Sequence, residues 1–240
     1  MRKSATIALK LHKWLGLLVG IQVLLWLLSG LYMVIVDIDF IHGDPLVRNT
    51  QKPLDTGFAP GITMARLRSD YPTATAIALQ PLLDRPVYAV STPRARHLVD
   101  ALTGDVLSPL NEAAARTIAA YHYNGDAAVT RATLVTSHAP LEIRGRTLPL
   151  WKIDFDDHLA TSFYIDPASG ALVTRRHAYW RVFDVMWMLH IMDYRERDEV
   201  HHALLWIAQA VALTLLLSGA WVLAHRLTAI SRRKQRMRRL

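Results

Sequence analysis

The sequence has 240 residues, 52% of them hydrophobic, with 28 basic and 20 acidic side chains and no cysteine. The lack of cysteine excludes disulfides, iron–sulfur clusters, thiolate-ligated haem and haem attached through a C-x-x-C-H motif. The chain also has no P-loop, dinucleotide fingerprint, nucleophile elbow or zinc-protease helix.

Two uncharged stretches, residues 15–36 and 203–224, are each long enough to cross a hydrocarbon core of roughly 30 Å. The first follows a short basic segment, residues 1–14, as the core of a signal peptide would. However, it is longer than the roughly 7–15 residues of such a core, and no A-x-A-like cleavage site follows it. We therefore expect two retained transmembrane helices.

The charges are distributed unevenly along the chain. All 20 acidic residues lie between Asp37 and Glu199, while residues 1–36 carry four basic residues and residues 201–240 carry seven. The remaining 17 basic residues leave the middle with a net charge of −3. This positive-inside pattern predicts that both termini lie in the cytoplasm and that the central region lies outside it. The basic tail, 225–240, directly follows a span, which favours contact with membrane lipids and no binding of nucleic acid.

The region between the spans begins with a linker rich in Pro, Gly and Asp, residues 37–60. Two units follow. The first, 61–110, opens with a helical pattern behind Thr63, a candidate N-cap, and the second, 111–177, opens with a helical pattern at 111–123. The expected strands are 76–79, 86–91 and 97–100 in the first unit and 128–136, 149–155 and 162–165 in the second.

Both units end in the same motif, which is an aliphatic residue, Asp, two residues, Thr or Ser, and Gly. Asp100 begins one copy and Asp166 the other, about 66 residues later. In such a turn the Asp side chain can bind backbone amides and the Gly can adopt a positive φ. The shared order of helix, strands and turn predicts two copies of one α/β unit.

Residues 178–202 are expected to form an interfacial amphipathic helix and a connector to the second span. Its aromatic residues and one histidine recur at spacings of 3, 4, 3 and 4, which places them on one helix face. These residues are Trp180, Phe183, Trp187, His190 and Tyr194.

The two spans resemble each other. Each has a Ser–Gly pair, Ser29–Gly30 and Ser218–Gly219, and a glutamine near its middle, Gln22 and Gln209. Small residues let helices approach closely, and glutamines can bond between helices. Because two spans give one chain few neighbours for these surfaces, we expect a two-fold homodimer.

Three segments together resemble the PepSY-associated transmembrane family, which includes iron-regulated inner-membrane proteins and siderophore-iron reductases. They are LHKWLGLLVGIQVLLWLLSGLYM (11–33), the two D-x-x-[TS]-G hairpins, and WRVFDVMWMLHIMDY (180–194). The resemblance implies an α+β membrane protein in which two transmembrane helices flank a periplasmic domain of two PepSY-like α/β repeats, with an added interfacial helix. It also implies haem b held by histidines, and electrons passed outward to ferric iron or a ferric chelate. Longer members of the family have four or more spans.

Haem b needs two axial ligands, and imidazole suits iron. At 1.5 Å per residue, His12 and His225 lie about 20 Å and 18 Å from the span centres, in one cytoplasmic layer. His190, His201 and His202 share the opposite layer. His190 is the leading candidate because it lies on the aromatic face, and its partner is left open among His202, His201 and His190 of a second copy. Met186, one turn earlier, is a weaker candidate.

A second polar cluster is DFDDH, which contains Asp154, Asp156, Asp157 and His158. Strand alternation would place Asp154 and Asp156 on one face, where they suit a hard cation; a solvated strand end is the competing interpretation.

Three functions remain open at this point. The first is a haem-dependent ferric reductase, which would need quinol or a partner protein as electron donor because the chain has no flavin or nicotinamide motif. The second is a non-enzymatic membrane-anchored module that binds a partner protein or transporter. The third is a structural subunit of a larger oxidoreductase.

The charge pattern generates a topology prediction. A reporter that is active only outside the cytoplasm should be inactive when fused after Leu240 and active when inserted in the region between the spans. Activity of the fusion after Leu240 would contradict the proposed orientation.

Overall fold

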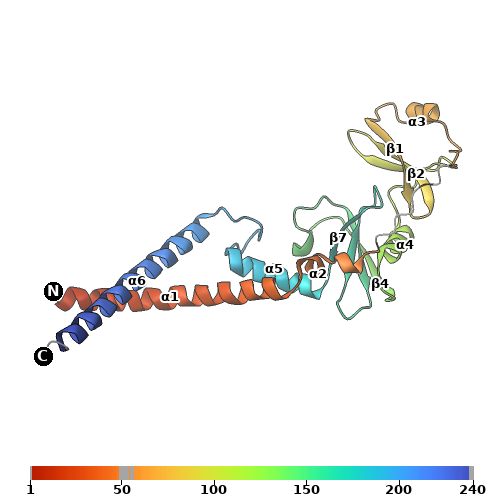
Figure 1. The fold of residues 1–240 in the computed structure, drawn as a ribbon. Helices are drawn as coiled ribbons and strands as arrows, with labels where there is room; N and C mark the ends of the chain where they lie inside the picture. Colours follow the sequence, from red (N-terminus) through yellow and green to blue (C-terminus); the bar gives the residue numbers. More distant parts are fainter. Residues whose placement is uncertain (1, 49–53, 55–56, 238–240) are drawn as a thin grey trace. The chain divides into compact units, whose positions relative to one another are not determined.

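The computed structural model describes residues 2–48, 54 and 57–237. The chain divides into two compact units (Figure 1), each described here by itself. The helical unit comprises Met1–Ile35 and Phe183–Leu240, and the sheet unit comprises Val36–Val182.

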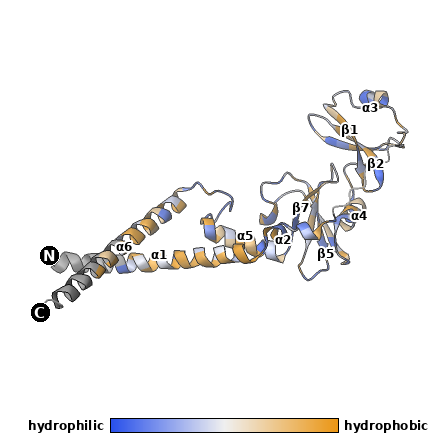
Figure 2. Cartoon of the chain, in the orientation of Figure 1, coloured by the Kyte–Doolittle hydropathy of each residue, from blue (hydrophilic) through white to orange (hydrophobic). Residues whose placement is uncertain are grey.

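The helical unit contains α1 (Arg2–Ile35), the end of α5 (Ala178–Ile191) and α6 (Ala203–Met237). Within α1 and α6, Lys13–Ile35 and Ala203–Ala220 are long and apolar enough to cross a membrane, as the hydropathy colouring in Figure 2 shows. The protein buries 6% of the first stretch and none of the second. These helices therefore differ from the core helices of a globular domain, and they indicate association with a membrane.

Helix α5 ends earlier than the sequence pattern suggested. Met192 adopts φ +58°, which breaks the helix after Ile191. The prediction that Tyr194 extends the aromatic face of the helix is therefore wrong. Asp193 organises the loop that follows, since its carboxylate accepts hydrogen bonds from the amides of Arg195, Glu196, Asp198 and Glu199. Desolvation alone would raise the pKa of Asp193, but these backbone bonds lower it overall.

The sheet unit is α+β, with two antiparallel sheets in the orders β1-β2-β3 and β4-β5-β6-β7. The strands are β1 (Ala76–Leu82), β2 (Arg85–Ser91), β3 (Arg96–Asp100), β4 (Val129–Val135), β5 (Leu150–Phe155), β6 (Ser162–Ile165) and β7 (Leu172–Arg176). Helix α3 (Met64–Asp70) precedes the first sheet and α4 (Glu112–His122) the second, while the 3-10 helix η2 (Leu141–Ile143) lies between β4 and β5. The six predicted strands and both helices are confirmed. Strand β7 was not predicted.

The N-caps explain where the helices of the two units begin. The Thr63 hydroxyl accepts a hydrogen bond from the Arg66 amide, and the Asn111 side chain accepts one from the Ala114 amide. Each cap satisfies a backbone N–H that has no partner within its own helix.

The motif that ends each unit forms the same turn twice. The Gly104 amide donates to the Asp100 carbonyl at 2.9 Å, and the Gly170 amide donates to the Asp166 carbonyl at 2.8 Å. Each aspartate side chain also accepts the amide two residues later. The glycines have φ +85° and +69°, values that favour residues without a Cβ. The repeat seen in the sequence is thus a repeat of local structure.

Part of the segment predicted as a linker is packed into the sheet unit. It forms α2 (Ile38–His42) and the 3-10 helix η1 (Asp44–Leu46), and Ile41 is fully buried. His177 is also fully buried, and its Nε2–H donates to the carbonyls of Phe40 and Ile41 at 2.9 and 3.1 Å. These bonds attach α2 to the residue that precedes α5.

A charged cluster holds the start of α5 in the same unit. The Arg181 guanidinium donates to the Glu142 carboxylate at 2.7 Å, to the Ala160 carbonyl and to the Ser162 hydroxyl. The Tyr164 hydroxyl donates to the same carboxylate. Burial would raise the pKa of Glu142, but its hydrogen bonds from Arg181 and Tyr164 lower it overall.

Burial lowers the pKa of His177, although its two carbonyl bonds act in the opposite direction. The folded chain therefore keeps this side chain neutral at a pH where the unfolded chain, with a pKa of about 6.5, binds a proton. We predict that the free energy of unfolding falls as the pH drops below about 6.5. His177→Gln, which keeps a side-chain N–H donor but does not titrate, should reduce this slope in urea unfolding of the detergent-solubilised chain. The exposed residue His158 provides the control: His158→Gln should keep the slope. Equal slopes in both variants would contradict the assignment.

Candidate functional site

The candidate site lies in the helical unit, where His190 near the end of α5 meets α1. The Trp26 indole N–H donates to the His190 carbonyl at 2.8 Å, and the Ser29 Oγ lies 2.9 Å from His190 Nδ1. Trp26 and Ser29 are three residues apart, so they lie on one face of α1. The Ser29 side chain is fully buried. One face of α1 therefore binds both the backbone and the ring of His190.

The hydrogen bonds of Ser29 determine the protonation of the His190 ring. The Ser29 hydroxyl lies 2.7 Å from the Leu25 carbonyl, which can only accept. Because the single hydroxyl proton is used there, the oxygen is left to accept Nδ1–H from His190. We therefore place a proton on His190 Nδ1, which in the neutral imidazole leaves the lone pair on Nε2.

Gly30 leaves room for the ring. A Cβ added at this position would lie 3.5 Å from His190 Cε1, an ordinary contact distance, so a longer side chain would compete with the imidazole for space. The Ser–Gly pair of α1, predicted from the sequence to be a surface for helix contacts, is thus used within the chain by His190.

These features fit an axial haem ligand. Metal-binding histidines usually donate their second ring N–H to a fixed acceptor, which sets the tautomer and the ring orientation. Ser29 supplies that acceptor, and Nε2 keeps the lone pair that iron requires. The rings of Phe183 and Trp187 stack on α5 with centroids 6.3 Å apart and add apolar surface to the same helix.

The other candidate histidines have different surroundings in the structure. His202 uses both ring nitrogens, since Nε2–H donates to the Ile191 carbonyl at 2.9 Å and Nδ1 accepts the Leu205 amide at 3.3 Å. It therefore caps α6 and ties it to α5. His201 is exposed. His12 belongs to α1 and His225 to α6, but the structure does not describe their side chains.

The sequence pattern did not indicate an ion pair that the structure shows in the helical unit. Asp184 on α5 is buried, and its carboxylate accepts a 2.5 Å hydrogen bond from Arg197 in the connector. Breaking such a pair leaves a buried charge and is strongly destabilising. The signal in the sequence was an acidic residue within an aromatic and aliphatic helix, which calls for a partner. Trp26 and Ser29 could have been found from their spacing on α1, but nothing in that spacing identifies His190 as their partner.

The DFDDH cluster has structural roles at two of its positions. Asp154 accepts from the Ser162 hydroxyl at 2.7 Å, and Asp157 accepts from the Tyr123 hydroxyl at 2.9 Å. Burial and the bond to Asp157 raise the pKa of Tyr123 to about 12. Strand β5 ends at Phe155, so Asp156 does not share a strand face with Asp154 as predicted.

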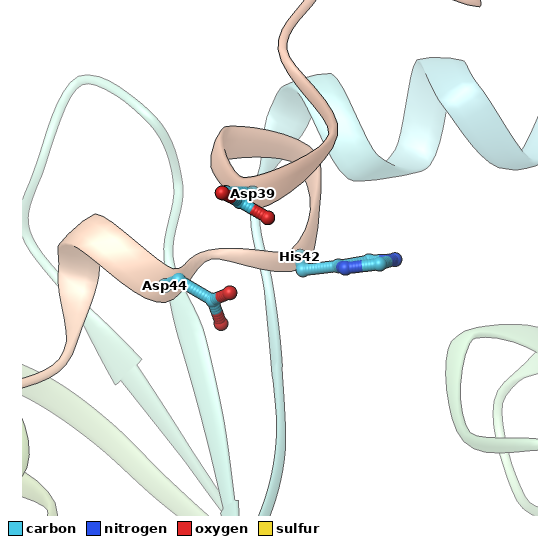
Figure 3. A group of neighbouring side chains, drawn as sticks. All are labelled: Asp39, His42 and Asp44. Atoms are coloured by element: carbon cyan, nitrogen blue, oxygen red, sulfur yellow. The ribbon is translucent and has the colours of Figure 1, made fainter.

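A third group, Asp39, His42 and Asp44, brings possible ligand atoms within 4.8 Å of one another on α2 and η1 (Figure 3). All three residues are exposed, and Asp44 forms an ion pair with Arg175. The group is therefore accounted for by solvation and by its bond to β7.

We predict that Ser29→Ala leaves His190 Nδ1–H without its acceptor and lowers the free energy of unfolding by about 1–3 kcal/mol. Ser218→Ala is the matched control, because the Ser218 hydroxyl donates to the Leu215 carbonyl of its own helix and has no other partner among the described residues. Imidazole ¹⁵N chemical shifts of the haem-free protein should report Nδ1–H in the wild type and a weaker preference in Ser29→Ala. An Nε2–H tautomer in the wild type would contradict the assignment.

No family model, curated protein or solved structure matches this chain. The resemblance to PepSY-associated transmembrane proteins therefore remains a prediction, and functional conclusions rest on the site itself.

Proposed function

We propose that the chain is an inner-membrane haem b protein that passes electrons to ferric iron or ferric chelates on the periplasmic side, with quinol or a partner protein as donor. The observation that carries the proposal is the Ser29–His190 hydrogen bond, which uses Nδ1 and so makes Nε2 of the neutral ring the ligand atom. The two apolar helices and the positive-inside charge distribution support a membrane location.

Haem b, when bound, supplies one-electron chemistry through its iron. His190 would hold the iron through Nε2. Ser29 fixes the ring and its tautomer, and Trp26 fixes the backbone of the same residue. The aromatic rings of α5 would exclude water, and such an apolar environment tunes the potential of a bound iron. His201, or His190 of a second copy, would supply the second ligand to the iron, because His202 would first have to give up both of its bonds.

The test is the absorbance of the detergent-purified protein after haem is supplied. The wild type should show a Soret band that shifts on reduction with dithionite. His190→Ala should lose most of that band while its circular dichroism keeps the helical signal, because the ring contacts α1 through its edge and is not part of a packed core. His42→Ala, at an exposed position of the sheet unit, is the control and should keep full haem content.

Two results would contradict the proposal. A protein that stays colourless with haem supplied is not a haem protein. Full haem content in His190→Ala, together with loss in His12→Ala, would move the site to the cytoplasmic layer.

The alternative function, a membrane-anchored module that binds a partner, is favoured by a separate feature of the sheet unit. A cleft of about 670 Å³ is lined by Arg48, Arg96 and His122, and its described lining contains no acidic residue. Burial lowers the pKa of His122, so the positive charge of the cleft comes from Arg48 and Arg96. Such a cleft suits an acidic group of a partner, and a colourless protein would make this the leading function.

A further inference from the structure

Helices α1 and α6 of the helical unit enclose a second feature, a half-open cavity of about 350 Å³. Its lining is aliphatic, aromatic or thioether, with one exception. That exception is Gln22, one turn before Trp26 on α1, and Trp26 itself also lines the cavity. The cavity lies within the apolar stretches of both helices and so within the depth that would face hydrocarbon.

The amide nitrogen of Gln22 has no partner among the described residues. Its Nε2 is buried and makes no hydrogen bond to any residue in the part of the chain that the structure describes. A buried amide without a partner is unfavourable, more so where no water can reach it, and such groups in native proteins usually bind something. The side chain lines a cavity, which leaves space beside it for a molecule that pairs with the amide.

We propose that this cavity binds the ring of a membrane quinone or quinol. A ring oxygen would pair with the Gln22 amide, while the flat ring would pack against Trp26, Met192 and the aliphatic side chains. The volume is near the lower end of small-molecule pockets, about 300–1,000 Å³, and so suits a head group whose tail leaves through the open side.

The cavity is physically connected to the candidate site. Trp26 lines the cavity with its ring and donates its indole N–H to the His190 carbonyl. A quinol held by Gln22 would therefore be separated from His190 by a single side chain. Its role as electron donor rests on the proposed function, whereas binding of the ring does not require haem.

The experiment titrates a short-tailed benzoquinone into the detergent-purified full chain and follows quenching of tryptophan fluorescence. The wild type should give saturable binding. Gln22→Leu, which keeps the side-chain volume but removes the amide, should bind roughly tenfold more weakly, as expected for the loss of one hydrogen bond. Gln209→Leu is the matched control, because Gln209 is an exposed glutamine of α6 that does not line the cavity. It should bind like the wild type.

Several outcomes would overturn the proposal. Equal affinity in the wild type and Gln22→Leu, or equal loss in both glutamine variants, would remove Gln22 from the site. Displacement of the quinone by excess phospholipid would show that the amide pairs with the ester carbonyl of a lipid. A change of oligomeric mass in Gln22→Leu, without a change in affinity, would show that it pairs with a second copy.

Measuring the Soret band on the same samples separates the two proposals. Binding that depends on Gln22 in a colourless protein would leave the cavity assignment standing while the haem function fails. A full Soret band with no saturable quinone binding would leave the haem function standing while the cavity assignment fails.

Discussion

The hydroxyl of Ser29 carries a single proton, and the destination of that proton determines what His190 can do. Because the proton goes to the Leu25 carbonyl, the serine oxygen accepts Nδ1–H from His190, and Nε2 is the ring nitrogen that remains for another ligand. The same contact, with the Trp26 bond, attaches the end of α5 to α1. His202 then attaches the start of α6 to the last residue of α5. The arrangement of the helical unit thus depends on a few polar bonds between otherwise apolar helices, which is where hydrogen bonds specify packing best.

The sheet unit uses buried polar groups in a similar way. Helix α5 begins beside a cluster in which the Glu142 carboxylate serves both Arg181 and Tyr164. His177 binds the carbonyls of α2 just before this point. The Glu142 carboxylate, the Arg181 guanidinium, the Tyr164 hydroxyl and His177 Nε2 are all paired, and paired buried polar groups can fix one conformation without a large loss of stability. The start of α5 is therefore held within the sheet unit by hydrogen bonds.

The sequence was informative wherever the signal was local. Caps such as Thr63 and Asn111, the alternating strands, the uncharged stretches and the turns at Asp100 and Asp166 all depend on neighbours within a few residues. Long-range pairings could not be read in this way. Ser29 and His190 are 161 residues apart, and the sequence pattern suggested a surface for another helix at the first position and a ligand at the second. Tyr194 fitted the helical spacing, but a positive φ at Met192 ends the helix before it. Periodicity identifies faces, whereas partners depend on the tertiary fold.

The hydrogen-bond chain at His190 also has an end point. It runs from Nδ1–H to the Ser29 oxygen and from the Ser29 proton to the carbonyl of Leu25, which has no proton to pass on. No carboxylate continues it within the described residues. The proton on Nδ1 is therefore bonded into a chain that ends at a backbone carbonyl, a group that cannot relay it. An electron that reached this part of the protein would leave that proton in place.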